Sequence, residues 1–528
     1  MATLIIKQPK GFWPVTAVSF WERFSFYGFR SFLALYMSAE LLYSDAAIFE
    51  TYAALMAIMY IAPLIGGYLA DRFTGRRFTI AAGLAFLAIG QFILCFLDAS
   101  YFEWALILLI IGTGYFKPNI AASLNNFYDE NDERRESGFT YYFTMINAGA
   151  LLAPICGLLA QKPEILFKIS DFFGFDLSNY LNPNTLMWRG GFFLSGIVAI
   201  LGLGLFLVNS KATYFHNAPI INRTPWLVKA LAFIASIALC AILFPTFKAP
   251  ALMNFFIFSS GLACLGFWFY MSKKCSKTHS KALWTGLLLI IYNISFIAII
   301  EQIGSTISLF VHRNVDRMVL GYEIPASVFQ AIDPMFIVIF GPLLAILWNF
   351  SPKTSHSASA PLKFTISILL TSFSIFALYL GCHWATPDGL INAIWLYLFC
   401  IFCALAELCI LPVGLSLITK ISPPQHTSLV TAIWFMSRAF AYYLGGVIAQ
   451  NMLSVPTKGG TALALDSLLV YKKAFLNLGI TFFVIGCIIG ITAPALTRIL
   501  VLYFKTEADN HATANVLDPK QISEVNPP

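Results

Sequence analysis

Charged side chains share one stripe of the first long apolar segment, residues 14–37. Arg23 and Arg30 are seven residues apart with Tyr27 between them, so a helix would present all three on nearly the same side. Each charge at the centre of a membrane helix costs about 2.5–3.5 kcal/mol. Two arginines on one stripe exceed what a simple ion pair between helices requires. The stripe therefore predicts a polar cavity with a cationic, aromatic wall.

Further ionisable residues lie well inside other apolar segments. Four basic and four acidic side chains form a balanced set: Glu22, Arg23, Arg30, Lys117, Glu301, Asp333, Glu407 and Arg438. Ionisable residues in membrane segments face the interior of a helix bundle and pair with one another. We therefore expect ion pairs around a polar cavity, and we predict that Arg438 compensates the charge of Asp333.

The three acids of the second half of the chain suggest proton chemistry. Burial favours the neutral form of a carboxyl group, whereas a nearby cation favours the ionised form. Glu301, Asp333 and Glu407 could therefore bind and release a proton as a cationic partner approaches or moves away. This is the physical basis of a proton-coupled carrier. The alternative for each acid alone is a fixed salt bridge.

Composition excludes several classes of protein. The 528 residues are 59% hydrophobic and 11% charged, whereas soluble domains carry about 25% charged residues. The net charge of +7 does not indicate a nucleic-acid binder, because the basic residues form short clusters between apolar runs. Neither the H-E-x-x-H zinc motif nor a phosphate-binding G-x-x-x-x-G-K-[ST] loop is present. The chain is predicted to be a membrane protein and not an enzyme.

A helix of about 20 residues crosses the hydrocarbon layer, and on this rule the sequence predicts fourteen spans. They are 14–37, 47–70, 78–97, 103–123, 139–161, 188–209, 226–246, 252–271, 283–310, 327–349, 364–381, 391–419, 428–452 and 473–503. The ionisable residues fall in the first six and the last six. This grouping predicts an N-terminal six-helix bundle (1–210), an inserted two-helix hairpin (211–281), a C-terminal six-helix bundle (282–505) and a disordered tail (506–528).

Lysine and arginine are more frequent in every second connecting segment, which sets the expected orientation. Counting from the N-terminus, the richer segments include 72–77, 211–229 and 273–281. Positive residues favour the cytoplasmic side of a membrane. Both termini are therefore predicted to be cytoplasmic.

Short motifs accompany these residues. Between the second and third predicted spans the chain reads Gly66-Gly67-Tyr-Leu-Ala-Asp71-Arg72-Phe-Thr-Gly75-Arg76-Arg77, which resembles the cytoplasmic loop motif of the major facilitator superfamily. Other motifs are Glu22-Arg23-Phe24-x-x-Tyr27-Gly28, Gly112-x-Gly114-x-x-Lys117-Pro118, Glu301-Gln302 and Glu407-x-x-x-x-Pro412-x-Gly414-Leu415-Ser416. With this set, spread from residue 19 to about 445, the chain resembles the proton-dependent oligopeptide transporter family.

The resemblance implies a fold and a function. The fold would be all-α, a major facilitator fold of two six-helix bundles plus two inserted helices. The function would be symport of di- and tripeptides with protons, by alternating access of the two bundles and with ion pairs between them as gates. The resemblance also implies a bacterial inner-membrane location, small peptides and protons as partners, no cofactor and no nucleic acid. We expect the chain to act as a monomer in the lipid bilayer.

The resemblance assigns roles to residues whose positions match the motifs. In this family the acid at Glu301 pairs with the arginine at Arg30, and the acid at Glu407 meets the peptide amino group and pairs with Lys117. The implied substrate-binding residues are Arg23, Tyr27, Arg30, Tyr60, Lys117, Asn147, Glu407 and Trp434. The candidates for proton coupling and gating are Glu22, Arg30, Lys117, Glu301, Asp333 and Glu407. The loop motif contributes Gly67, Asp71, Arg72, Gly75 and Arg76.

The sequence also departs from the family pattern. Ser19 stands where the first acid of the usual Glu-x-x-Glu-Arg motif would be, and Asp333 stands before a proline where asparagine is usual. Asp333 is our candidate for the missing proton site. The departures leave open a second function, transport of an amino acid derivative, nitrate or a drug-like anion with altered or absent proton coupling.

Overall fold

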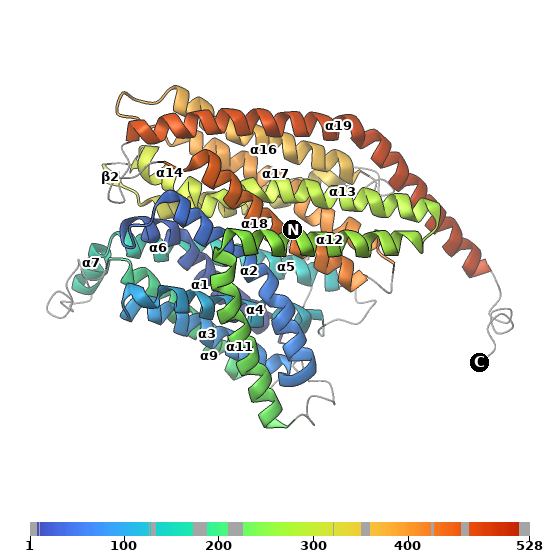
Figure 1. Cartoon of the computed structure of the whole chain (residues 1–528), viewed down its shortest axis with the longest axis horizontal. Helices are drawn as coiled ribbons and strands as arrows, with labels where there is room; N and C mark the ends of the chain where they lie inside the picture. Colours follow the sequence, from blue (N-terminus) through green and yellow to red (C-terminus); the bar gives the residue numbers. More distant parts are fainter. Residues whose placement is uncertain are drawn as a thin grey trace.

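The computed structural model describes residues 8–9, 11–125, 127, 134–172, 187–209, 225–319, 321–349, 359–423, 427–455 and 464–516. Long helices, most of them side by side, make up almost all of this part of the chain (Figure 1). One short antiparallel ribbon pairs β1 (Met318–Val319) with β2 (Tyr322–Glu323). The predicted all-α membrane fold is confirmed.

The first helices of the chain form one bundle. Its members are α1 (Phe12–Ala39), α2 (Asp45–Leu69), α3 (Arg76–Phe96), α4 (Phe102–Asn125), α5 (Arg134–Leu152), α6 (Pro154–Gln161), α7 (Glu164–Phe172) and α9 (Arg189–Asn209). Within it, α1 packs against α5 and α9, and α4 packs against α2 and α3. These helices gather in the lower part of Figure 1. We call them the N-terminal bundle.

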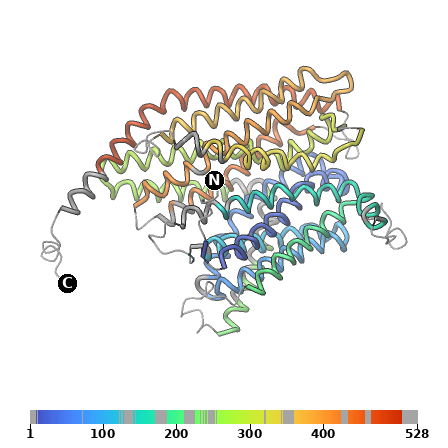
Figure 2. The backbone as a smooth tube through the Cα atoms, turned by 180° about the vertical axis from the view of Figure 1, so that it is seen from behind, coloured from blue at the N-terminus to red at the C-terminus, as the bar shows by residue number. Residues whose placement is uncertain are grey.

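The last helices form a second bundle, which lies above the first in Figure 1. Its members are α13 (Lys277–Ile300), α14 (Thr306–Asn314), α15 (Ile332–Asn349), α16 (Ala360–His383), α17 (Ile394–Ile421), α18 (Thr427–Ile448) and α19 (Ala464–Val516). Here α16 packs against α17 and α19, while α15 packs against α17. Figure 2 shows the same two groups from behind. We call this group the C-terminal bundle.

Two further helices link the bundles, α11 (Trp226–Lys248) and α12 (Pro250–Lys273). Helix α11 packs against α2 and α4, whereas α12 contacts α13 and α18. The inserted pair therefore has one helix on each bundle. Its position agrees with the predicted order of six, two and six, although the exact domain boundaries stay a prediction.

Each of the fourteen predicted spans is helical in the structure, although 139–161 covers both α5 and α6 and 283–310 covers both α13 and α14. Within the described residues, ten helices are long and apolar enough to cross a membrane. The other four predicted spans correspond to α1, α11, α15 and α18. Helix α1 carries three charged residues, Glu22, Arg23 and Arg30. These residues belong to the polar site described below. The chain is therefore an integral membrane protein.

The predicted tail needs a correction. Helix α19 continues without interruption to Val516, so the first part of the segment 506–528 is helical rather than disordered. Residues 506–516 contain neither proline nor glycine, the residues that most readily end a helix. Residues 517–528 lie outside the described part of the chain.

Two local breaks in the helices position functional residues. At Gly75, φ is 83°, which lets the chain turn between α2 and α3 within the loop motif. Between α13 and α14, Glu301–Gly304 form a 3-10 turn, and Ser305 leaves helical geometry with φ −127° and ψ −89°. A 3-10 stretch in the middle of a helix often marks a hinge, and this one carries Glu301.

Candidate functional site

A cavity of about 160 Å³ lies between the two bundles. The N-terminal bundle contributes Tyr27, Arg30, Ser31 and Asn147, and the C-terminal bundle contributes Glu301, Asp333, Glu407 and Arg438, with Gln330 at the base of α15. Apolar side chains from α13, α15 and α17 complete the wall. The structure therefore brings together residues separated by more than 400 positions in the chain, as the polar-cavity prediction requires. We call this the central cavity.

The strongest polar contact across the central cavity joins Arg30 to Glu301. The Arg30 guanidinium donates to a Glu301 carboxylate oxygen, and its Nε donates to the Tyr52 hydroxyl at 2.6 Å. Both charged side chains are about nine-tenths buried. Arg30 belongs to the N-terminal bundle and Glu301 to the C-terminal one, so this ion pair connects the two.

Arg438 shares the same carboxylate, which corrects one of our predictions. Its guanidinium lies 3.2 Å from Glu301 Oε1 and 3.4 Å from the Tyr60 hydroxyl, and no ion pair joins it to Asp333. The reason is helix packing: α18 packs against α2 and α13, whereas α15 packs against α17 and α5. Asp333 is buried, and its Oδ1 has no hydrogen-bond partner within the described residues.

The predicted stripe on α1 is present. Tyr27 lies between the two arginines, with its ring centroid 5.8 Å from Arg23 Cζ and 5.6 Å from Arg30 Cζ. Arg23 forms a bidentate ion pair with Glu22, at 2.5 and 2.6 Å. The charge of Glu22 therefore balances Arg23, while Arg30 relies on the other bundle for its counterion.

Lys117 adds a third cation to this side. Its Nζ lies 4.7 Å from the ring centroids of both Phe26 and Tyr60, and Nζ has no hydrogen-bond partner within the described part of the chain. Cations are attracted to the faces of aromatic rings. Among the described residues no ion pair joins Lys117 to Glu407, so the structure does not form the pair that the resemblance implies. Lys117 and Glu407 therefore do not balance each other's charge in this structure.

The remaining predicted residues are divided in location. Asn147 and Glu407 line the central cavity. Arg23, Tyr60, Lys117 and Trp434 do not line it; Trp434 is 5% exposed and packs against Gly414 in the C-terminal bundle. In the loop motif, a Cβ at Gly67 would lie 3.7 Å from Pro118, and the side chains of Asp71 and Arg72 lie outside the described residues.

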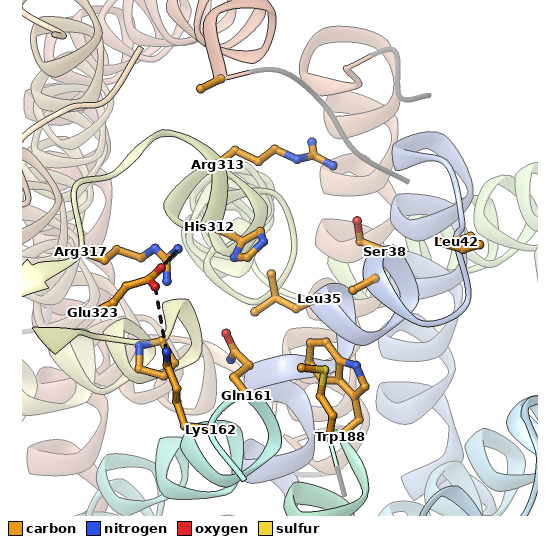
Figure 3. Close-up of a pocket in the computed structure, with 14 residues that line it drawn as sticks. Leu35, Ser38, Leu42, Gln161, Lys162, Trp188, His312, Arg313, Arg317 and Glu323 are labelled. Carbon is orange, nitrogen blue, oxygen red and sulfur yellow. Dashed lines mark ion pairs between the residues drawn. The ribbon is translucent and has the colours of Figure 1, made fainter. Parts of the chain in front are cut away.

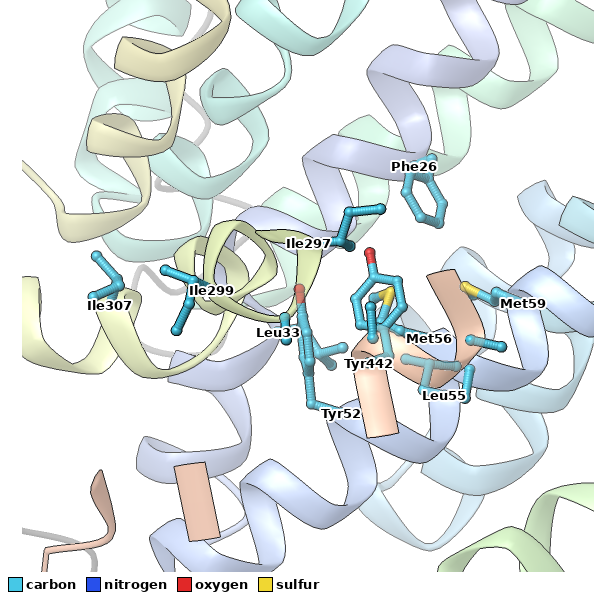
Figure 4. Packing of buried hydrophobic residues seen from close by; sticks show 14 of the residues in the cluster. Phe26, Leu33, Tyr52, Leu55, Met56, Met59, Ile297, Ile299, Ile307 and Tyr442 are labelled. Atoms are coloured by element: carbon cyan, nitrogen blue, oxygen red, sulfur yellow. The ribbon is translucent and has the colours of Figure 1, made fainter. Parts of the chain in front are cut away.

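Sequence reasoning missed two tyrosines that complete the ion-pair network. Tyr52 accepts a hydrogen bond from Arg30, and Tyr442 stacks on Tyr60 with ring centroids 5.5 Å apart. Figure 4 shows the Tyr52 and Tyr442 rings among apolar side chains, with Leu33, Met56 and Ile297 close by. These apolar neighbours are at most 2% exposed. Low polarity around the network strengthens the electrostatic contacts inside it.

Because Gly304 has no side chain, there is room beside it for Tyr52 and Arg30 of the ion-pair network. A Cβ at this position would lie 1.9 Å from the Tyr52 hydroxyl oxygen and 2.7 Å from Arg30 Nε. Any other residue would therefore displace the Tyr52 hydroxyl or the Arg30 guanidinium, which contact each other. The hinge between α13 and α14 and the ion-pair network are for this reason one structural unit.

We expect Gly304→Ala to destabilise the protein by about 1–3 kcal/mol, the usual effect of overpacking a filled interior. Thermal unfolding in detergent measures it. Tyr52→Phe removes the oxygen that the new methyl group would meet, so the double variant should lose less stability than the sum of the two single changes. Gly204→Ala is the matched control, because nothing lies within 4 Å of a Cβ there. Additive losses would contradict the proposed clash.

Further polar contacts join the bundles at one end of the molecule, which carries the loops 40–44 and 384–393. We call it the closed face. Arg313 donates two hydrogen bonds to Asp45, at 2.7 and 2.8 Å, and the Val455 N–H donates to the same carboxylate at 3.0 Å. Asp45 begins α2 directly after Ser44, whose hydroxyl caps the helix by accepting from the Ala47 N–H. Asp45 therefore contacts the second bundle from the first turn of α2.

Two amides make similar contacts nearby. Gln161 Nε2 donates to the Ser327 hydroxyl at 2.6 Å, and Gln330 Nε2 donates to the Ser31 carbonyl at 2.9 Å. Both join the N-terminal to the C-terminal bundle. The described contacts thus hold the bundles together from the central cavity to the closed face. No motif in the sequence pointed to them, because none of these side chains lies at the centre of an apolar segment.

Comparison with known proteins identifies the family. A model of the POT family matches residues 77–464. The chain is 28% identical over 504 residues to the dipeptide and tripeptide permease B of Photorhabdus asymbiotica, covering 94% of this chain and 97% of that protein. It is 29% identical over 514 residues to the uncharacterized transporter YclF of Bacillus subtilis, covering 93% of this chain and 95% of that protein.

Solved structures agree in fold. A crystal structure of the peptide transporter POT in complex with sulfate superposes with a TM-score of 0.75 and 25% identity, over 94% of this chain and 96% of that one. The structure of tetrameric PepTSo2 gives a TM-score of 0.77 at 23% identity, over 92% and 98% of the two chains. These matches and the family model confirm the resemblance drawn from the motifs, and the chain belongs to the POT family, with its major facilitator fold.

Proposed function

We propose that this protein is a proton-coupled symporter that imports di- and tripeptides by alternating access. The observation that carries the proposal is the buried ion pair between Arg30 and Glu301, which joins the two bundles at the wall of a shared cavity. The names of its relatives support it, since they include dipeptide and tripeptide permeases A and B.

The charges of the site differ between the bundles. The N-terminal bundle supplies Arg30, with Lys117 over the Phe26 and Tyr60 rings, whereas the C-terminal bundle supplies three acids, Glu301, Asp333 and Glu407, against one cation, Arg438. A peptide at neutral pH has a carboxylate at one end and an ammonium group at the other. A cationic wall facing an acidic wall would bind both ends with charge-assisted hydrogen bonds. We therefore assign Arg30, Lys117, Tyr27 and Asn147 to the carboxylate side, and Glu407 to the amino end.

The ion pairs would act as gates. The bundles are held together at the closed face, which the predicted topology places outside the cell. The structure then corresponds to a state that is closed toward the outside. Opening this face requires the Arg30–Glu301 and Asp45–Arg313 pairs to separate, and a carboxylate left without its cation becomes able to bind a proton. Proton binding and opening of the face would be coupled in this way.

Reconstituted protein provides the test. Liposomes with an inward proton gradient should accumulate dialanine, and an uncoupler that collapses the gradient should abolish accumulation while leaving counterflow exchange intact. Uptake that does not respond to the uncoupler would contradict proton coupling. Absence of any dialanine transport or counterflow would contradict the proposed function as a whole.

We propose that Asp333 replaces the acid that the family motif usually has at the position of Ser19. It is buried in the C-terminal bundle, lines the central cavity and has an oxygen without a partner among the described residues. We expect Asp333→Asn to lower the number of protons taken up per dialanine, measured with a pH indicator alongside labelled peptide. Asp388→Asn, in the loop after α16, serves as the control. An unchanged proton-to-peptide ratio in Asp333→Asn would exclude this assignment.

The departure from the family motif at Ser19 also supports a second candidate function, which is transport of another small solute with altered coupling. Competition separates the two possibilities. If labelled dialanine uptake is inhibited by unlabelled di- and tripeptides but not by amino acids or nitrate, the peptide assignment stands. The monomeric state and the inner-membrane location stay predictions; the solved PepTSo2 structure is described as tetrameric.

A further inference from the structure

A second cavity, of about 610 Å³, lies between the bundles at the closed face (Figure 3). Lys162, which directly follows α6, lines it from the N-terminal bundle, and Arg317 and Glu323 of the segment around the β-ribbon lie next to Lys162 on the same side. Gln161 lines this cavity, while Ser31 and Gln330 line the central one. The Gln161–Ser327 and Gln330–Ser31 contacts therefore separate two cavities that follow one another along the same interface. We call the second one the outer cavity.

The outer cavity carries more positive than negative charge. Glu323 is shared by two cations, with Arg317 Nη2 at 2.5 Å and Lys162 Nζ at 4.0 Å, as the dashed lines of Figure 3 show. Arg313 also lines the cavity, but Asp45 neutralises it. Among the described residues, one carboxylate for two cations leaves one positive charge without a counterion. In addition, the buried Nε of Arg317 has no hydrogen-bond partner among the described residues.

The opposite wall of the outer cavity is apolar. It consists of Leu35, Leu42, Met187 and Trp188. Leu42 and Trp188 have φ angles of 53° and 67°, which residues other than glycine rarely adopt. The Trp188 indole packs against Phe32, with ring centroids 6.3 Å apart. A cationic wall facing an apolar wall suits a small molecule that has both a carboxylate and a side chain.

The Lys162–Glu323 contact is too weak to act as a gate that holds the two bundles together. Its atoms are 4.0 Å apart, and the two side chains are 40% and 46% exposed. Ion pairs of this kind contribute little to stability because solvent screens them. By contrast, the nearby Asp45–Arg313 pair is bidentate and 1% and 6% exposed. The locking role belongs to that pair, which leaves Lys162 available for a ligand.

We propose that the outer cavity is a first docking site for peptide carboxylates, where Lys162 and Arg317 capture the cargo before it enters the central cavity. The inference rests on the proposed function. Glu323 acts as an internal competitor: it occupies the two cations when no peptide is present and is displaced from Lys162 when a carboxylate arrives. Substitutions of Lys162 and Glu323 should therefore have opposite effects.

The test measures the concentration of external dialanine that gives half-maximal uptake. Lys162→Gln should raise it about threefold, and Glu323→Gln should lower it, with both effects shrinking at high salt. The methyl ester of dialanine lacks the carboxylate, so its potency as a competitor should be the same in Lys162→Gln as in the native protein. Lys168→Gln is the matched control, an exposed lysine on α7 that does not line the cavity.

The outcomes separate the docking site from the transport function. Changes of the same sign in Lys162→Gln and Glu323→Gln would indicate a gate and overturn the proposal, as would no change in either. If the native protein transports no dialanine, the proposed function fails. The docking site is then decided by thermal stabilisation of the purified protein with dialanine: opposite shifts in the two variants support it, and equal shifts overturn it.

Discussion

Replacing Glu301 with glutamine is expected to reduce proton-driven uptake of dialanine by about 100-fold or more. The Glu301 carboxylate is the counterion of both Arg30 and Arg438. Glutamine keeps the shape of the side chain but leaves two buried guanidinium groups facing one another without a negative charge. It also removes a carboxylate that could carry the proton. Initial uptake rates in proteoliposomes measure the loss.

Two further variants test whether the loss comes from the missing charge of Glu301. Glu301→Asp keeps the charge on a shorter side chain and should recover part of the activity, which a purely steric effect would not allow. Glu164→Gln changes an exposed acid on α7 and should leave uptake unchanged. Thermal unfolding confirms that each variant is folded. Uptake by Glu301→Gln within about twofold of the native rate would remove Glu301 from the gate.

The second large effect is expected at the closed face. Arg313→Gln leaves the carboxylate of Asp45, which is 1% exposed, without its cation. Breaking a buried pair on one side destabilises by about 3–5 kcal/mol, and here the loss falls on the state in which the closed face is sealed. We expect a lower unfolding temperature and a larger distance between spin labels on the two bundles at this face, measured by pulsed electron paramagnetic resonance.

A double variant tests whether Asp45 and Arg313 stabilise the protein as a pair. Asp45→Asn together with Arg313→Gln leaves no uncompensated charge, so its stability should lie closer to the native protein than that of Arg313→Gln alone. Arg498→Gln, on an exposed position of α19, is the control. If the double variant is as unstable as the sum of the single variants, Asp45 and Arg313 do not act as a pair.

Several features of the site were predictable because they depend on one helix or one motif. The stripe of Arg23, Tyr27 and Arg30 follows from helical spacing, and the structure places both guanidinium groups beside the Tyr27 ring. The pairing of Arg30 with Glu301 came with the family resemblance, and it is present. Such predictions hold because they need only the local geometry and the high cost of a charge in lipid.

Pairings between helices were less predictable. Arg438 was expected at Asp333 but reaches Glu301, because α18 packs beside α13 and away from α15. Trp434 was expected in the pocket but faces Gly414. Both outcomes depend on which neighbours each helix packs against. Helical periodicity identifies a polar face, but it does not say which neighbour that face meets.

The amino-acid sequence by itself determined that this chain spans a membrane with helices, that charges are kept inside the apolar segments, and that its motifs are those of one transporter family. Hydropathy, residue spacing and composition suffice for this, since the bilayer imposes the same length and polarity on every span. Only the tertiary structure decided which cation meets which acid, how Asp45 and Arg313 close one face, and where a second cavity remains. Those features depend on side chains from helices far apart in the chain, and packing alone brings them within a few ångströms of one another.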